Sequence, residues 1–252
     1  MSEDRVVFAR SVGNVADWAQ ACADRLADAL RAGLAENGRA LFAGAGGSTP
    51  SPIYARLAQA DLDWSRITVT LVDERYVPDT HCESNAALIK RTLMTGPAAA
   101  ATFLPLFHPS VTVDRAAALA AHNLAKAGDR LDAVLLGMGD DGHICSMFPE
   151  SPTLRTLLSP DLKPTVLGVP KGRDGLAPSR ERLSMNLPWL MTARCVVLAI
   201  AGKTKREVYM ARASYSPGFG SVSDDEIRAR TEPMVALIAA GVPLDVLWTE
   251  KA

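Results

Sequence analysis

The chain has 252 residues, of which 48% are hydrophobic and 22% are charged, enough apolar material to bury a full core. Its 27 basic and 28 acidic residues leave a formal net charge of -1. The charge of the whole molecule therefore does not favour binding to nucleic acid or to an anionic membrane, and any anionic ligand has to be held by local groups.

The cysteines and the N-terminal residues indicate the cellular compartment of the protein. Cys22, Cys82, Cys145 and Cys195 are far apart and lack the paired spacing of metal-binding or redox motifs. The first residues, MSEDRVVFARSVGNVADW, contain no apolar signal region, and no later segment reaches the roughly 18 apolar residues of a membrane span. We therefore expect a cytoplasmic protein with reduced thiols and with no metal, no cofactor and no membrane contact.

The first half of the chain alternates between helical and strand patterns. Apolar residues recur at helical spacing from Val15 to Leu34, and Gly38 is a typical helix stop. The segment RALFAGAGG predicts a strand that ends in a tight loop, and Thr49-Pro50 then introduces a helical pattern. RITVTLVDERYVP predicts a β-branched strand that ends in charged residues, and SNAALIKRTLM predicts a helix with Ser84 as its N-cap.

The second half continues the alternation. Residues 113–128 predict a helix, 131–139 and 195–202 predict buried strands, and 203–213 predict another helix. Near-continuous apolar strands that alternate with helices indicate an α/β fold, with a mainly parallel, Rossmann-like sheet covered by helices on both faces. We expect residues 1–252 to form a single domain in which 169–181 and 214–226, rich in Pro, Gly, Ser and charge, are loops.

Ligands of open parallel sheets bind at the carboxyl ends of the strands, so the residues that follow the predicted strands matter most. After the first of these strands, Gly46 and Gly47 allow the backbone to approach a ligand, and Ser48 and Thr49 can hold a phosphate. The spacing is not that of a P-loop. A glycine turn with a Ser/Thr helix cap fits the same residues, and both interpretations remain open.

Charged residues follow two further strands. Asp73 could orient a substrate hydroxyl, and Arg75 could supply positive charge to an anion or oxyanion. A solvent-facing ion pair would have the same pattern. Lys205 lies near a helix N-terminus, where a cation is better tolerated beside a bound anion, although a solvated lysine explains it equally well.

The stretch GMGDDGH supplies a candidate base. Its glycines allow a sharp turn that presents His143, with Asp141 two residues away as a possible orienting carboxylate. An imidazole that is largely neutral near pH 7 suits a general base acting on water. A serine nucleophile is not expected, because neither Ser48 in GSTP nor Ser146 after His143 lies in a G-x-S-x-G elbow.

Together these stretches resemble the 6-phosphogluconolactonase family, within the larger group that includes glucosamine-6-phosphate deaminases. The resemblance covers most of the chain. In order, it runs through GGSTPSPIYARLA, VDERYVPDTHCESNAALIKRTLM, LLGMGDDGHICSMFPES, RLSMNLPWLMTARCVVLAIAGKTKREVY and PLDVLWTEKA. The deaminase branch typically follows its histidine with an Ala-Phe-Asn-Glu-Pro type of sequence, whereas Ser146-Met147-Phe148-Pro149 looks like the lactonase version. Ile144 and Cys145 depart from the usual Thr-Ala of that version.

The resemblance implies a fold of the NagB/RpiA/CoA transferase-like type and hydrolysis of a sugar-phosphate lactone, without a cofactor or metal. It implies that His143 activates water, that Asp141 orients His143 and that Arg75 supports developing negative charge. It also implies a phosphate and hydroxyl grip by Gly46, Gly47, Ser48, Thr49, Asp73, Arg182 and Lys205, with Arg173 as an alternative to Arg182. A deaminase or isomerase and a non-catalytic sugar-phosphate sensor remain alternatives. We expect a monomer or small homo-oligomer whose ligand is a small molecule.

Overall fold

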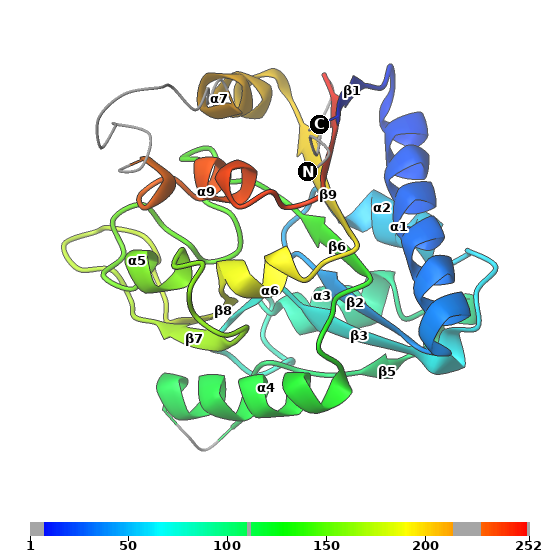
Figure 1. Cartoon of the computed structure of the whole chain (residues 1–252), viewed down its shortest axis with the longest axis horizontal. Coiled ribbons are helices and arrows are strands. Elements are labelled where there is room, and N and C mark those ends of the chain that lie inside the picture. Colours follow the sequence, from blue (N-terminus) through cyan, green and yellow to red (C-terminus); the bar gives the residue numbers. More distant parts are fainter. Residues whose placement is uncertain (1–7, 110–111, 214–227, 251–252) are drawn as a thin grey trace.

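The computed structural model describes residues 8–109, 112–213 and 228–250, which build a parallel sheet with helices on both faces (Figure 1). The sheet has seven strands, and each strand pairs in parallel with its neighbours. In spatial order they are β1 (Phe8–Ser11), β10 (Leu244–Thr249), β9 (Cys195–Ala201), β6 (Ala133–Leu136), β2 (Ala40–Gly44), β3 (Ile67–Leu71) and β5 (Thr102–Phe103). The predicted α/β fold with a mainly parallel sheet is confirmed.

Helices cover the two faces of this sheet. In Figure 1, α1 (Val15–Asn37) and α2 (Ser51–Leu57) lie on one side, and α7 (Lys203–Ala213) and α9 (Pro233–Ala239) lie on the other. α1 packs against α2, β2, β6, β9 and β10, whereas α7 packs against β9 and α9. Because both faces are covered, every residue of β2 and of β6 is buried, which explains their uninterrupted apolar sequences.

The longer predicted helices are present in the structure, and capping residues mark their ends. Asn14 accepts a hydrogen bond from the Asp17 amide at the start of α1, and Gly38 ends the helix in the left-handed conformation at φ 68°. Ser84 accepts a bond from the Ala87 amide and begins α3 (Asn85–Thr92) as predicted. The helix predicted over residues 113–128 is α4 (Val113–Ala127), and Gly128 is its C-cap. The short elements α5 (Leu154–Leu157), α6 (Leu187–Met191), η1 (Trp64–Arg66) and η2 (Gly96–Ala100) complete the connections.

A second, antiparallel sheet was not predicted. It consists of β4 (Asp73–Arg75), β8 (Arg182–Met185) and β7 (Val166–Val169), and α4 packs against β7 and β8. The predicted strand over RITVTLVDERYVP is in fact two strands in two sheets. Val72 joins them, because its N–H donates to the Gly44 carbonyl at 3.0 Å and its carbonyl accepts from the Met185 N–H at 2.9 Å. The charged end of the predicted strand therefore forms part of a separate sheet, which lies beside the strand ends of the first sheet.

The two predicted loops differ in what the structure describes of them. Beyond Val169, the last residue of β7, the loop 169–181 contains no helix or strand. The predicted loop 214–226 lies outside the described residues. No helix in the described ranges is long and apolar enough to cross a membrane.

Candidate active site

A cleft of about 240 Å³ lies where β2, β4, β6 and β8 end or begin. Every predicted site residue except Asp141 lines it: Gly46, Gly47, Ser48, Thr49, Asp73, Arg75, His143, Arg182 and Lys205. Arg173 is not among the lining residues, so Arg182 is the arginine of that region that reaches the cleft. Residues more than 150 positions apart in the sequence therefore meet in one place.

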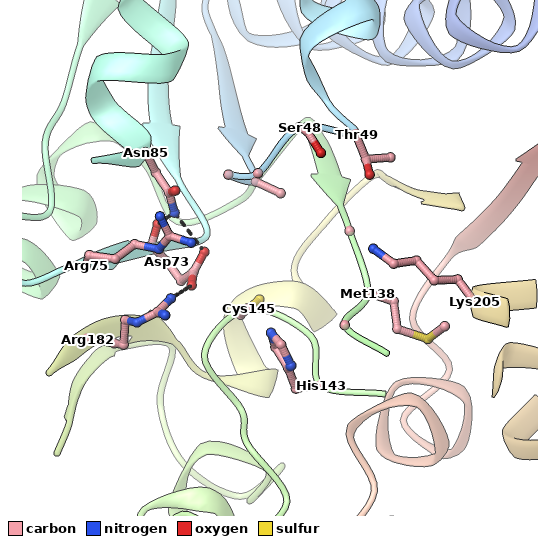
Figure 2. Close-up of a pocket in the computed structure, with 15 residues that line it drawn as sticks. Ser48, Thr49, Asp73, Arg75, Asn85, Met138, His143, Cys145, Arg182 and Lys205 are labelled. Carbon is pink, nitrogen blue, oxygen red and sulfur yellow. Dashed lines mark hydrogen bonds and ion pairs between the residues drawn. The ribbon is translucent and has the colours of Figure 1, made fainter. Parts of the chain in front are cut away.

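The charged side chains of the cleft lie on two sides of His143. Figure 2 shows Arg75 and Arg182 on one side, with Asp73 and Asn85, and Lys205 on the other. Ser48 and Thr49 lie between these sides, across from His143. A ligand with oxygen-rich groups at both ends would meet a cation at each end.

The glycine-rich loop connects β2 to α2. Among the described residues no side chain caps the start of α2, whose N-cap is Pro50. The predicted alternative, that Ser48 or Thr49 serves as a helix cap, is therefore wrong. Their hydroxyls are not engaged in capping and line the cleft instead.

Asp73 is held by protein groups on several sides. Its carboxylate accepts a hydrogen bond from the Ser146 hydroxyl at 2.6 Å and one from the Asn85 amide at 3.3 Å, and Arg182 Nη1 lies at 3.9 Å. Asp73 is only 6% exposed. Burial lowers the pKa of Arg182, while the nearby Asp73 carboxylate acts in the opposite direction. These contacts fix the carboxylate and the guanidinium relative to each other at the wall of the cleft.

Glu74 organises the elements that carry Arg75 and Asn85. Its buried carboxylate accepts backbone N–H bonds from Arg75 at 2.7 Å and from Asn85 and Ala86 at 2.8 Å, and the Ser84 hydroxyl donates to it at 3.0 Å. Burial raises the pKa of Glu74 although these bonds favour the ionised form. The guanidinium of Arg75 donates to a backbone carbonyl of the loop before α3. The Glu74 side chain thus joins β4 to the start of α3.

The loop after β6 presents His143 in a tight turn. The Gly139 N–H donates to the His143 carbonyl at 2.9 Å, and the Gly142 N–H donates to the Gly139 carbonyl at 3.0 Å. The imidazole lies directly against Gly139, where a Cβ atom would overlap the ring. The ring also packs on Phe148, with centroids 4.3 Å apart. The glycine spacing of this stretch therefore makes room for the imidazole at the end of the strand.

Asp141 determines which nitrogen of His143 is basic. Its Oδ1 lies 2.6 Å from His143 Nδ1 and accepts the His143 backbone N–H at 3.0 Å. Partial burial acts to raise the pKa of Asp141, but the bonds and charge of His143 outweigh it and bring the pKa below its ordinary value. An ionised carboxylate can only accept, so Nδ1 carries the proton and Nε2 is the basic nitrogen.

Sequence reasoning missed several groups at the site. Asn85 and Cys145 also line the cleft, Ser146 holds Asp73, and Phe148 supports the imidazole. Ser146 and Phe148 belong to the sequence pattern that resembles the lactonase version, but that pattern predicts neither of their contacts. In the described part of the chain, no three His, Cys, Asp or Glu side chains gather as metal ligands would.

The chain is similar to known proteins over most of its length. The sequence profile of the family described as "Glucosamine-6-phosphate isomerases/6-phosphogluconolactonase" matches residues 13–218. The 6-phosphogluconolactonase of Pseudomonas aeruginosa is 41% identical over 94% of this chain and 92% of its own length. That of Rhizobium meliloti is 38% identical, with 93% and 95% covered.

A solved structure leads to the same family. The crystal structure of a 6-phosphogluconolactonase from Shewanella baltica has a TM-score of 0.83 with this chain at 27% sequence identity. The likeness covers 97% of this chain and 98% of that one. The similarity thus includes both the strand ends that form the cleft and the helices around them. The chain belongs to the family of glucosamine-6-phosphate isomerases and 6-phosphogluconolactonases.

Proposed function

We propose that the protein hydrolyses 6-phospho-D-glucono-1,5-lactone to 6-phospho-D-gluconate, a step of the oxidative pentose phosphate pathway. The observation that carries the proposal is the His143–Asp141 pair, at 2.6 Å, in a cleft with cations on two sides. The relatives at 41% and 38% identity, both named 6-phosphogluconolactonase, support the same reaction. The substrate is a small molecule, and the proposal implies a cytoplasmic enzyme. That the protein is a monomer or small homo-oligomer remains a prediction.

The chemistry follows from the orientation of His143. Its Nε2 takes a proton from water while the water oxygen attacks the carbonyl carbon of the lactone. The resulting tetrahedral oxyanion is stabilised by positive charge, which we assign to Arg75. The bond between that carbon and the ring oxygen then breaks, and the ring oxygen takes the proton from the imidazolium. The products are a free hydroxyl and a carboxylic acid, which releases its proton to the solvent and becomes a carboxylate. The imidazole is neutral again once it has given its proton to the ring oxygen.

The remaining residues would hold the substrate. We assign the phosphate to Lys205 and to the loop of Gly46, Gly47, Ser48 and Thr49, whose hydroxyls line the same part of the cleft. Asp73 and Arg182, fixed relative to each other on the opposite side, would bind the sugar hydroxyls. Binding both ends of the substrate fixes the lactone carbonyl beside the base, which is the source of the proximity effect.

Deamination of glucosamine 6-phosphate is the alternative, because the family includes isomerases of that substrate. The residues after His143 favour the lactonase, since Ser146 and Phe148 each have a defined contact here, with Asp73 and with the imidazole. A sensor that binds without turnover would need the cation grip but not a base whose tautomer is set by a carboxylate.

The test is a direct comparison of the two reactions. Hydrolysis of freshly generated 6-phosphoglucono-1,5-lactone is followed as proton release, and the spontaneous rate is subtracted. Ammonia release from glucosamine 6-phosphate is measured with the same preparation. We expect lactone turnover and no ammonia. Ammonia without lactone turnover would support the deaminase, and binding of either sugar phosphate with no turnover would support the sensor.

A further inference from the structure

The last turn of α7 touches the loop that carries the candidate base. Arg212 Nη2 donates to the backbone carbonyl of Asp141 at 2.8 Å, across 71 positions of sequence. Arg212 does not line the cleft, so it reaches the chemistry only through this loop. We propose that Arg212 is a positioning residue that holds the Asp141–His143 pair in its working orientation, an inference that rests on the proposed function.

Gly142 shows how closely the guanidinium packs on the loop. A Cβ atom at position 142 would lie 2.6 Å from Arg212 Nε, closer than a real side chain could come. Gly142 also has φ 84°, a conformation that L-residues with a side chain rarely adopt. The glycine between Asp141 and His143 therefore serves two needs, because it permits the turn and it leaves space for Arg212.

Arg212 is itself held in place by α9. Its Nη1 lies 3.6 Å from the Glu232 carboxylate at the N-cap of that helix, and Arg228 bonds the same carboxylate at 3.0 Å. The side chains of Arg212 and Glu232 are 26% and 25% exposed. A partly buried pair with a second cation is less screened by solvent than an isolated surface pair. The guanidinium is thus anchored on one side before it contacts the loop on the other.

The contact matters because the Asp141–His143 pair is partly open to solvent. The side chains of His143 and Asp141 are 27% and 44% exposed, so the surrounding core does not immobilise them completely. Phe148 and Gly139 support the imidazole, whereas Arg212 supports the backbone of Asp141 from outside the cleft. Loss of Arg212 should therefore disturb the orientation of the base more than the grip on the substrate. Lys205 lies about two turns earlier on α7 and does not depend on this bond.

The experiment compares Arg212→Gln and Arg212→Lys with Arg206→Gln as a matched control. Arg206 lies on the same helix and packs over the Trp248 ring at 3.8 Å, without a place in the cleft. For Arg212→Gln we expect kcat to fall about tenfold while KM stays within about twofold, since a misplaced base slows the step and leaves binding intact. Arg212→Lys should recover part of kcat because it keeps a donor and the charge. Arg206→Gln should keep the wild-type kcat.

A second readout does not depend on turnover. In wild type and Arg206→Gln, the proton on His143 Nδ1 should give an NMR signal protected from exchange by its bond to Asp141. In Arg212→Gln the signal should broaden or disappear, while the thermal midpoint matches that of Arg206→Gln. A kcat of Arg212→Gln within twofold of wild type, or an unchanged Nδ1 proton signal, would overturn the inference. Wild type without lactone turnover would refute the proposed function instead, and the NMR comparison would still decide the role of Arg212.

Discussion

At the scale of single residues, the candidate site divides into contacts that are local in sequence and contacts that are not. His143 and Asp141 are two positions apart, so their pairing follows from the turn that the glycines permit, and the sequence predicts it. The bonds to Asp73 from Asn85 and Ser146 span 12 and 73 positions. No periodicity or local motif encodes such contacts, because they depend on how whole strands and loops pack together. Most of the residues that line the cleft were therefore found, together with Asp141, whereas Asn85 and Ser146, which hold Asp73, were missed.

The ionisation of Asp141 leads to a pH prediction. The pKa of Asp141 is lowered in the folded protein. The ionised group therefore contributes to stability at pH values above its unfolded pKa of about 3.9, and this contribution is lost only as the pH falls through the lower pKa of the folded state. Between pH 5 and 8 Asp141 stays a carboxylate. We therefore expect protonation of Asp141 to add nothing to any fall of kcat on acidification in this range, so that log kcat against pH should have a limiting slope of no more than one. A plot of log kcat against pH with a limiting slope of two would contradict this assignment.

At the scale of elements, Glu74 joins β4 of the second sheet to the start of α3. In sequence, one strand that continues past Leu71 cannot be distinguished from β3 followed by β4. The charged residues after Leu71 do not indicate a second sheet either. In the structure the Glu74 carboxylate satisfies the amides of Asn85 and Ala86 at the start of α3. Helix starts leave such amides without intrahelical partners, so a buried carboxylate there has a clear structural role.

Replacement of Glu74 by Gln should therefore destabilise the protein. A glutamine offers one acceptor oxygen in place of two, and its NH₂ group would face either the Ala86 N–H or, in the other amide orientation, the N–H groups of Arg75 and Asn85. We expect the free energy of unfolding to fall by about 1–3 kcal/mol in urea denaturation, the usual effect of an unsatisfied buried donor. Glu207→Gln serves as the control, since Glu207 is 65% exposed and pairs with Lys203 at 3.8 Å. Equal stability of Glu74→Gln and the control would rule out this role.

At the scale of the whole molecule, the alternation of strands and helices was enough to predict the parallel sheet and its two covered faces. The order of the strands was not predicted, because it depends on the crossovers and not on any one segment. The short edge strands β1 and β5 were also missed, since four and two residues carry too little pattern. That residues 1–252 form a single domain remains a prediction.

The distribution of thiols tests the packing of the whole molecule. Cys82 is exposed, whereas Cys22, Cys145 and Cys195 are buried. Burial raises the pKa of Cys22 and Cys195 to about 12, so these thiols are both inaccessible and protonated. We expect Ellman's reagent to modify Cys82 rapidly in the native protein and Cys22 and Cys195 only after denaturation. Rapid reaction of Cys22 or Cys195 in the native protein, identified by mass spectrometry, would show that the core is open to the reagent.

Activation of water by His143 is tested by measuring lactone turnover of His143→Asn beside wild type. His122→Asn is the matched control, because His122 lies exposed on α4 and does not line the cleft. We expect His143→Asn to lose about 100-fold or more in kcat, the typical contribution of a general base, and His122→Asn to keep wild-type turnover. Turnover by His143→Asn within a few fold of wild type, with correct folding shown by circular dichroism, would contradict this role of His143.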